Sequence, residues 1–260
     1  MVWILRFQIG VPYFFGGIAK LNVDWLRGEP LRTWMAARTD LEPIHTALTN
    51  SSVIWFMTYG ALLFDLLVVP LLLFRRTRVM AFVVACLFHL TNVWLFGLYI
   101  FPWLMIAATL LFFPPDWPLR LLRRFGRWTS TVATTPGDLP RGTSALRRTA
   151  PVVTALFALW VAVQLVVPLR HFAIEGRPSW TEEGHRFAWH MMLRDKSGSA
   201  RFHLTDRDHT WIVDPADHLT AAQVRELPWD PEHLVKFAHH LSEVHGGVEV
   251  RAETSVSVNG

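Results

Sequence analysis

Residues 16–28 read GGIAKLNVDWLRG and mark the point where an apolar segment ends on Lys20 and gives way to a polar one. Lysine is rare in this chain, which has three lysines among 25 basic residues. Arginine is the firmer anchor at a membrane surface, but unlike lysine it cannot lose its proton at ordinary pH. Desolvation disfavours the charged form of a lysine and can make it a general base. Lys20 is therefore either a candidate base or a cation that anchors a helix end.

The apolar residues lie mainly before position 170, although they make up 52% of the whole chain. Their runs predict a multi-pass α-helical membrane domain over residues 1–169. The run from 79 to 113 is too long for one span, and Gly97 and Pro102 offer a break within it. The first run lacks a small-residue cleavage site and is followed by more spans, so we interpret it as a membrane helix. The predicted spans are about 2–19, 53–74, 79–97, 98–113 and 151–169.

Arginines beside the spans predict the orientation of the protein. The loops at 75–78 and 119–150 hold three and seven arginines, and both lie on one side if the run 79–113 is a helical hairpin. The positive-inside rule makes that side cytoplasmic. Lys20 and all residues after Arg170 would then face the extracytoplasmic side. The intervening loop, residues 21–52, is expected to lie at the interface and to hold a short amphipathic helix near 31–37.

The second part of the chain, residues 170–260, holds ten of the twelve histidines and most of the charged residues. Its pattern predicts a small extracytoplasmic α/β domain, rich in strands and incomplete at its end. We expect a hairpin turn at 195–198 and helices over 221–227 and 231–245, the second capped by Asp230. The expected strands are 186–194, 200–205, 210–213 and 248–258.

A histidine, an asparagine and an aspartate lie within the predicted spans. His89 and Asn92 lie three residues apart on one helix face, where they can form interhelical hydrogen bonds or hold the oxygen of a quinone-type ring. Asp65 lies near the middle of its span, where an uncompensated carboxylate costs at least about 2.5 kcal/mol. It needs a structural partner, or it holds a proton or a ligand.

Several classes of function are disfavoured. The basic residues cluster beside apolar segments, which is typical of lipid contact and not of nucleic-acid binding. His233 and His240 share a helix face but lie two turns apart, and no zinc motif is present, so no metal is predicted. The chain has no P-loop, GxGxxG or GxSxG motif. Its single cysteine, Cys86, excludes a disulfide within the chain.

Four stretches together resemble a known family. They read YFFGGIAKLNVDW at 13–25, FDL at 64–66, FHLTN at 88–92 running on to FPPDWP at 113–118, and SWT at 179–181 with FAWHMM at 187–192. In this order and spacing they resemble the vitamin K-dependent γ-glutamyl carboxylases, and in particular bacterial homologues with the horizontally transferred transmembrane (HTTM) domain. Family members extend further at both ends, so we expect this chain to be truncated at both.

The resemblance implies an enzyme of the carbon-carbon lyase type that couples two reactions. It would oxidise vitamin K hydroquinone, or a related menaquinol, to the epoxide and carboxylate glutamate side chains of a peptide or protein with O2 and CO2. Lys20 matches the family's base. His89 would be catalytic and, with Asn92, would contact or orient the hydroquinone, and Asp65 would support that cofactor site. His190 stands at a position that varies in the family and is assigned no role.

Two other functions remain open from the sequence. One is a non-catalytic binding or assembly module in the membrane that shares the fold. The other is a membrane quinone oxidoreductase that uses the same quinone site for electron transfer.

Overall fold

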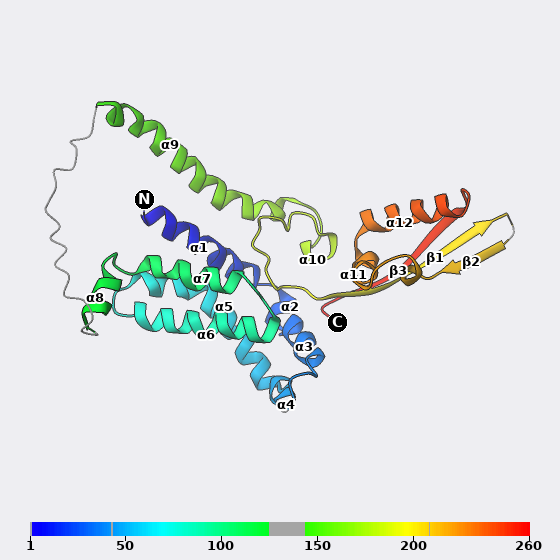
Figure 1. The fold of residues 1–260 in the computed structure, drawn as a ribbon, viewed down its shortest axis with the longest axis horizontal. Coiled ribbons are helices and arrows are strands. Elements are labelled where there is room, and N and C mark those ends of the chain that lie inside the picture. The colour runs from blue at the N-terminus through cyan, green and yellow to red at the C-terminus, as the bar shows by residue number, and fades with distance from the viewer. Residues whose placement is uncertain (1, 43, 125–143, 208) are drawn as a thin grey trace. The chain divides into compact units, whose positions relative to one another are not determined.

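The computed structural model describes residues 2–42, 44–124, 144–207 and 209–260 (Figure 1). Contacts divide the chain into two compact units. One consists of Met1–Leu21 and Tyr59–Met191, and the other of Asn22–Thr58 and Met192–Gly260.

Within the described residues, four helices are long and apolar enough to cross a membrane. Helix α1 is Val2–Ala19, α5 is Ser51–Leu73 and α6 is Arg78–Phe96. The fourth candidate span, Pro151–Ala173, combines most of α9 (Ser144–Val166) with the 3-10 turn η2 (Val167–Ala173). The predicted multi-pass helical membrane domain is confirmed, but the span expected at 98–113 is a shorter apolar helix, Phe101–Phe112, and is not one of these four.

The long apolar run breaks where Gly97 and Pro102 predicted. Gly97 is the C-cap of α6 and has a left-handed φ of 64°, which a glycine adopts without steric cost. Helix α7 (Phe101–Thr109) then begins with Pro102 in its first turn and continues into the 3-10 turn η1 (Leu110–Phe112). The short helix α8, Trp117–Arg124, follows. Of the arginine-rich linker predicted at 119–150, residues 125–143 lie outside the described part.

The core of the first unit lies between α1, α5, α6 and α7. Gly17 lets α1 approach α5 closely, because a Cβ atom at this position would lie 2.6 Å from the Leu66 side chain. The buried apolar residues of this core are Ile9, Tyr13, Phe64, Val68, Leu72, Ala81, Ala85, Met105 and Phe112.

The second unit contains an antiparallel sheet with strand order β2-β1-β3. Strand β1 is Lys196–Asp206, β2 is His209–Val213 and β3 is Glu249–Val258. Helices α11 (Ala221–Glu226) and α12 (Pro231–Val244) are separated by the 3-10 turn η4 (Leu227–Trp229). The core of this unit lies between the sheet and these helical segments. Its buried apolar residues are Phe202, Leu204, Leu227, Phe237 and Leu241.

Most predicted elements of this unit are confirmed. The strands expected at 200–205, 210–213 and 248–258 lie within β1, β2 and β3 or one residue outside them, and both helices are present. Asp230 caps α12 as predicted, since its side chain accepts hydrogen bonds from the backbone N–H groups of Glu232 and His233. The α-helical membrane part followed by a small strand-containing domain therefore agrees with the predicted fold class.

Two predictions in this region are wrong. Residues 186–194 form no strand, because Phe187, Trp189 and Met192 adopt left-handed φ angles of 63°, 58° and 52°, which an extended strand cannot contain. The predicted hairpin turn at 195–198 lies largely within β1, which begins at Lys196. Gly198 permits this pairing, since a Cβ atom there would lie 2.7 Å from the carbonyl oxygen of Ser255 on β3.

The loop after α1 belongs to the second unit and contains the short helices α2 (Val23–Leu26), α3 (Glu29–Ala37) and α4 (His45–Leu48). Helix α3 corresponds to the amphipathic helix predicted near 31–37.

Asn259, just after β3, joins this loop to the sheet. Its Nδ2 donates to Asp24 at 3.2 Å, and its Oδ1 accepts from the backbone N–H of Asp195 at 2.8 Å. Trp34 on α3 also donates to the Asp195 carboxylate.

Candidate functional site

Lys20 follows the last residue of α1, and its side chain turns inward. Its Nζ donates to Asp65 Oδ2 at 2.6 Å and to the carbonyl oxygen of Gly16 at 3.3 Å. Lys20 is 6% exposed and Asp65 7%. A lysine that anchors a helix at the membrane surface would extend its ammonium into water. The structure instead joins two of the predicted site residues, 45 positions apart, as a buried pair.

Glycines allow this pair to form. A Cβ atom on Gly16 would lie 3.4 Å from Asp65 Oδ2 and 4.0 Å from Lys20 Nζ, so a larger residue would occupy the space beside both groups. Gly17, one position on, brings α5 and therefore Asp65 close to α1. The GGIAK stretch thus places a lysine at the helix end and removes the side chains that would separate it from a carboxylate.

The pair is electrically neutral as a whole, whichever atom holds the proton. Two charges taken out of water lose several kcal/mol of hydration each, which only a close partner and further hydrogen bonds offset. Lys20 obtains both from Asp65 and the Gly16 carbonyl. Transfer of one proton from Nζ to Oδ2 would leave a neutral amine beside a neutral carboxylic acid.

His89 lies on α6 and is 1% exposed. Its Nε2 is 2.7 Å from the hydroxyl of Tyr13 on α1, and its ring is surrounded by Phe64, Phe88 and Phe101. Its other ring nitrogen, Nδ1, is buried and has no hydrogen-bond partner among the described residues. A buried polar atom of this kind can bond a ligand oxygen.

Tyr13 is a further residue of the site, which the sequence does not single out. The available signal was a phenol within an apolar span, in a chain with three tyrosines. Tyr13 and Lys20 are seven residues apart and therefore lie on the same face of the α1 region. The structure consequently shows two polar pairs, Tyr13 with His89 and Lys20 with Asp65.

Asn92 lies one turn after His89 and is half-buried. We find no hydrogen bond between its side-chain amide and any described residue. The structure therefore places Asn92 on the same helix face as His89 without pairing it to another site residue.

An apolar cleft of about 460 Å³ runs along α1 and α5 and reaches Asp65. Arg6 and Asp65 are its charged members, and its apolar lining includes Phe14, Phe15, Leu66 and Val69. His89 does not line this cleft. A lipid-soluble ring or chain fits such a lining, and the partnerless Nδ1 of His89 fits a ring oxygen. The residues present are therefore compatible with a hydroquinone, although the cleft and His89 are separate features.

Within the described ranges, no group of three or more His, Cys, Asp or Glu side chains is arranged to hold a metal ion.

Residues 1–117 match the family model of the HTTM domain, and residues 149–260 match that of the vitamin K-dependent gamma-carboxylase, lumenal domain. No solved structure matches the chain. Together with the helices and the sheet, these matches define a multi-pass membrane protein with an extracytoplasmic domain of the lumenal type. The two matched domains make the chain a member of the vitamin K-dependent γ-carboxylase family.

Proposed function

We propose that this protein is a membrane γ-glutamyl carboxylase in which Lys20 acts as the base. The observation that carries the proposal is the buried Lys20–Asp65 pair, whose Asp65 lines an apolar cleft. The C–H group at the γ-position of glutamate is too weak an acid for any side-chain base to deprotonate. When bound, vitamin K hydroquinone or a related menaquinol would supply with O2 the stronger base that this step needs, and would leave as its epoxide.

Lys20 and Asp65 have complementary roles in this proposal. Asp65 Oδ2 accepts the proton of Lys20 Nζ across 2.6 Å, so Nζ becomes a neutral amine while the pair as a whole remains neutral. Nζ can then take a proton from a bound hydroxyl group. Burial keeps water from competing for these protons.

His89 and Asn92 would hold the oxygen of the bound ring. The Tyr13 hydroxyl occupies His89 Nε2, which leaves Nδ1 as the nitrogen that meets a ligand. If the phenol donates, Nδ1 carries the ring proton and acts as a donor. Asn92 on the same helix face would add an amide contact.

We further propose that the soluble part of the chain, 170–260, presents a glutamate-containing peptide or protein at the extracytoplasmic face, where CO2 is added. Support for this orientation comes from the arginines at 75, 76 and 78, which the positive-inside rule assigns to the cytoplasm. Lys20 then lies at the same membrane face as the soluble domain.

The test is an assay of the protein in lipid nanodiscs with reduced vitamin K, labelled CO2 and a glutamyl peptide. Epoxide formation and incorporation of label into the peptide are expected, and both should depend on O2. Quinone reduction or oxidation without epoxide would instead identify an oxidoreductase. Absence of all turnover in a folded protein that binds the peptide would favour a binding module.

A further inference from the structure

Residues 182–191, which we name the strap, have an unusual backbone. Glu182, Phe187 and Trp189 all adopt left-handed φ angles, of 63°, 63° and 58°. Residues with large side chains rarely take this conformation, because Cβ approaches the backbone. It persists only where the surroundings enforce it.

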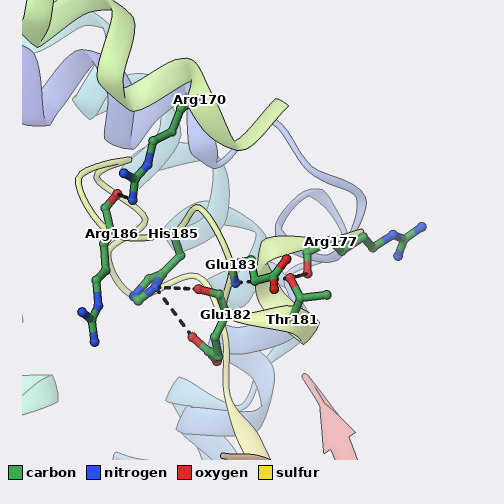
Figure 2. Close-up of polar contacts among 7 residues, drawn as sticks. All are labelled: Arg170, Arg177, Thr181, Glu182, Glu183, His185 and Arg186. Atoms are coloured by element: carbon green, nitrogen blue, oxygen red, sulfur yellow. Dashed lines mark hydrogen bonds and ion pairs between the residues drawn. The ribbon is translucent and has the colours of Figure 1, made fainter. Parts of the chain in front are cut away.

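Contacts with η2, at the end of the last candidate span, hold the strap in this conformation. Arg170 Nη2 donates to the carbonyl oxygen of Arg186 at 2.8 Å (Figure 2). The Arg170 guanidinium also lies 5.7 Å from the centre of the Phe187 ring. The rings of His171 and His190 lie 4.6 Å apart. Gly184 packs against His171 so closely that a Cβ atom would come within 3.0 Å of its Cα.

The end of the strap reaches the buried ion pair. Met191 Cε lies 3.9 Å from the point that a Cβ atom of Gly16 would occupy. That same point is 3.4 Å from Asp65 Oδ2 and 4.0 Å from Lys20 Nζ. The thioether methyl, the carboxylate and the amine therefore surround one small space beside α1.

We propose that Met191 is a positioning residue that covers the Lys20–Asp65 pair and excludes water from it, and that the strap holds Met191 there through Arg170 and His171. An apolar cover raises the strength of the interaction between Nζ and Oδ2 and prevents loss of the proton to solvent. The catalytic meaning of this cover rests on the proposed function. The cover itself can be tested without any turnover.

The experiment measures how fast a thiol at position 20 reacts with a membrane-impermeant methanethiosulfonate reagent in nanodiscs. The parent protein carries Lys20→Cys, Asp65→Asn so that no buried carboxylate is left without its lysine, and Cys86→Ala to remove the chain's own cysteine. Adding Met191→Ala should raise the modification rate about tenfold or more, because a covered site reacts in proportion to its open population. Met191→Leu, which keeps an apolar side chain, should stay near the parent rate.

Two matched controls make the result specific. Met80→Ala removes a methionine that is 60% exposed on α6 and should leave the rate unchanged. Arg170→Gln removes the anchor to Arg186 and should raise the rate, whereas Arg177→Gln should not, since the Arg177 guanidinium points away from the other labelled side chains (Figure 2).

Equal rates in the parent and in Met191→Ala overturn the proposal, and so does an equal rise in Met80→Ala. Because no hydroquinone or peptide is present, this result is independent of whether the protein proves to be a carboxylase.

Discussion

Lys20 Nζ and Asp65 Oδ2 lie 2.6 Å apart, and both side chains are almost fully buried. This relationship changes the meaning of each residue. A solvated lysine at a helix end anchors the helix at the membrane surface, and an unpaired carboxylate within a span destabilises the protein. As a pair they form a neutral unit in which one proton can occupy either atom, and this is the property that a buried amine base requires.

Substitution of Lys20 separates a base from an anchor. Lys20→Arg keeps the charge but cannot give up a proton, so it should lower epoxide formation and carboxylation as strongly as Lys20→Ala, by about 10² or more. A small exogenous amine should restore part of the activity of Lys20→Ala, because the vacated space admits a neutral base. Lys236→Ala, at an exposed lysine paired with Glu232, is the matched control. Normal epoxide formation by folded Lys20→Arg would show that Lys20 is not the base.

Loss of Asp65 should destabilise the membrane unit. Asp65→Ala leaves the Lys20 ammonium buried without its carboxylate, a change that typically costs about 3–5 kcal/mol. The double variant Lys20→Met with Asp65→Leu removes both charges and should unfold at a higher temperature than Asp65→Ala. Thermal unfolding in nanodiscs measures these differences. A double variant that is no more stable than Asp65→Ala would mean that the two side chains do not act as a pair.

Tyr13→Phe should remove the hydrogen bond at His89 Nε2 without altering the shape of the core. The loss of a buried hydrogen bond is expected to cost about 1–3 kcal/mol of stability. It should also change the ratio of the two neutral histidine tautomers, which nitrogen chemical shifts of labelled His89 report. Tyr99→Phe, at a tyrosine that is 86% exposed, is the control. An unchanged His89 spectrum in Tyr13→Phe would contradict the hydrogen bond at Nε2.

Asn259 should tie the loop after α1 to the sheet. Asn259→Gly keeps a residue that accepts the left-handed φ of 58° but removes the side-chain bonds to Asp24 and Asp195. We expect faster hydrogen exchange in α2 and α3 for this variant, with little change in α12. Asn259→Ala should be less stable still, because it adds backbone strain. Exchange that is unchanged in α2 and α3 would show that the loop folds without this connection.

The surface pair on α12 gives a pH-dependent prediction. The hydrogen bond and charge of Lys236 lower the pKa of the Glu232 carboxyl below its ordinary value of 4.5 and raise the pKa of the lysine. The pair therefore stabilises the fold above the ordinary carboxyl pKa, and this contribution is lost as pH falls through the lowered value. Lys236→Met should unfold at a slightly lower temperature than the parent at neutral pH and at the same temperature in strong acid. A difference that persists in acid would have another origin.

The membrane helices could be predicted from sequence because each depends on the length of an apolar run, which is a local property. The breaks at Lys20, Gly97 and Pro102 are local as well. The strands at 200–205, 210–213 and 248–258 followed from local alternation in the same way. The strand prediction failed at 186–194, where contacts with Arg170 and His171 hold the backbone in left-handed conformations. The domain boundary at 169/170, the orientation and the roles of the site residues stay predictions.

The sequence by itself determined which residues were chemically out of place: a lysine at a membrane boundary, and an aspartate, a histidine and an asparagine within apolar spans. Only the tertiary structure decided their partners. The close approach of α1 and α5 at Gly17 pairs Lys20 with Asp65, and the packing of α6 on α1 pairs His89 with Tyr13. Residues 45 and 76 positions apart meet through helix packing, which depends on side chains from the whole bundle and leaves no mark in any single stretch of sequence.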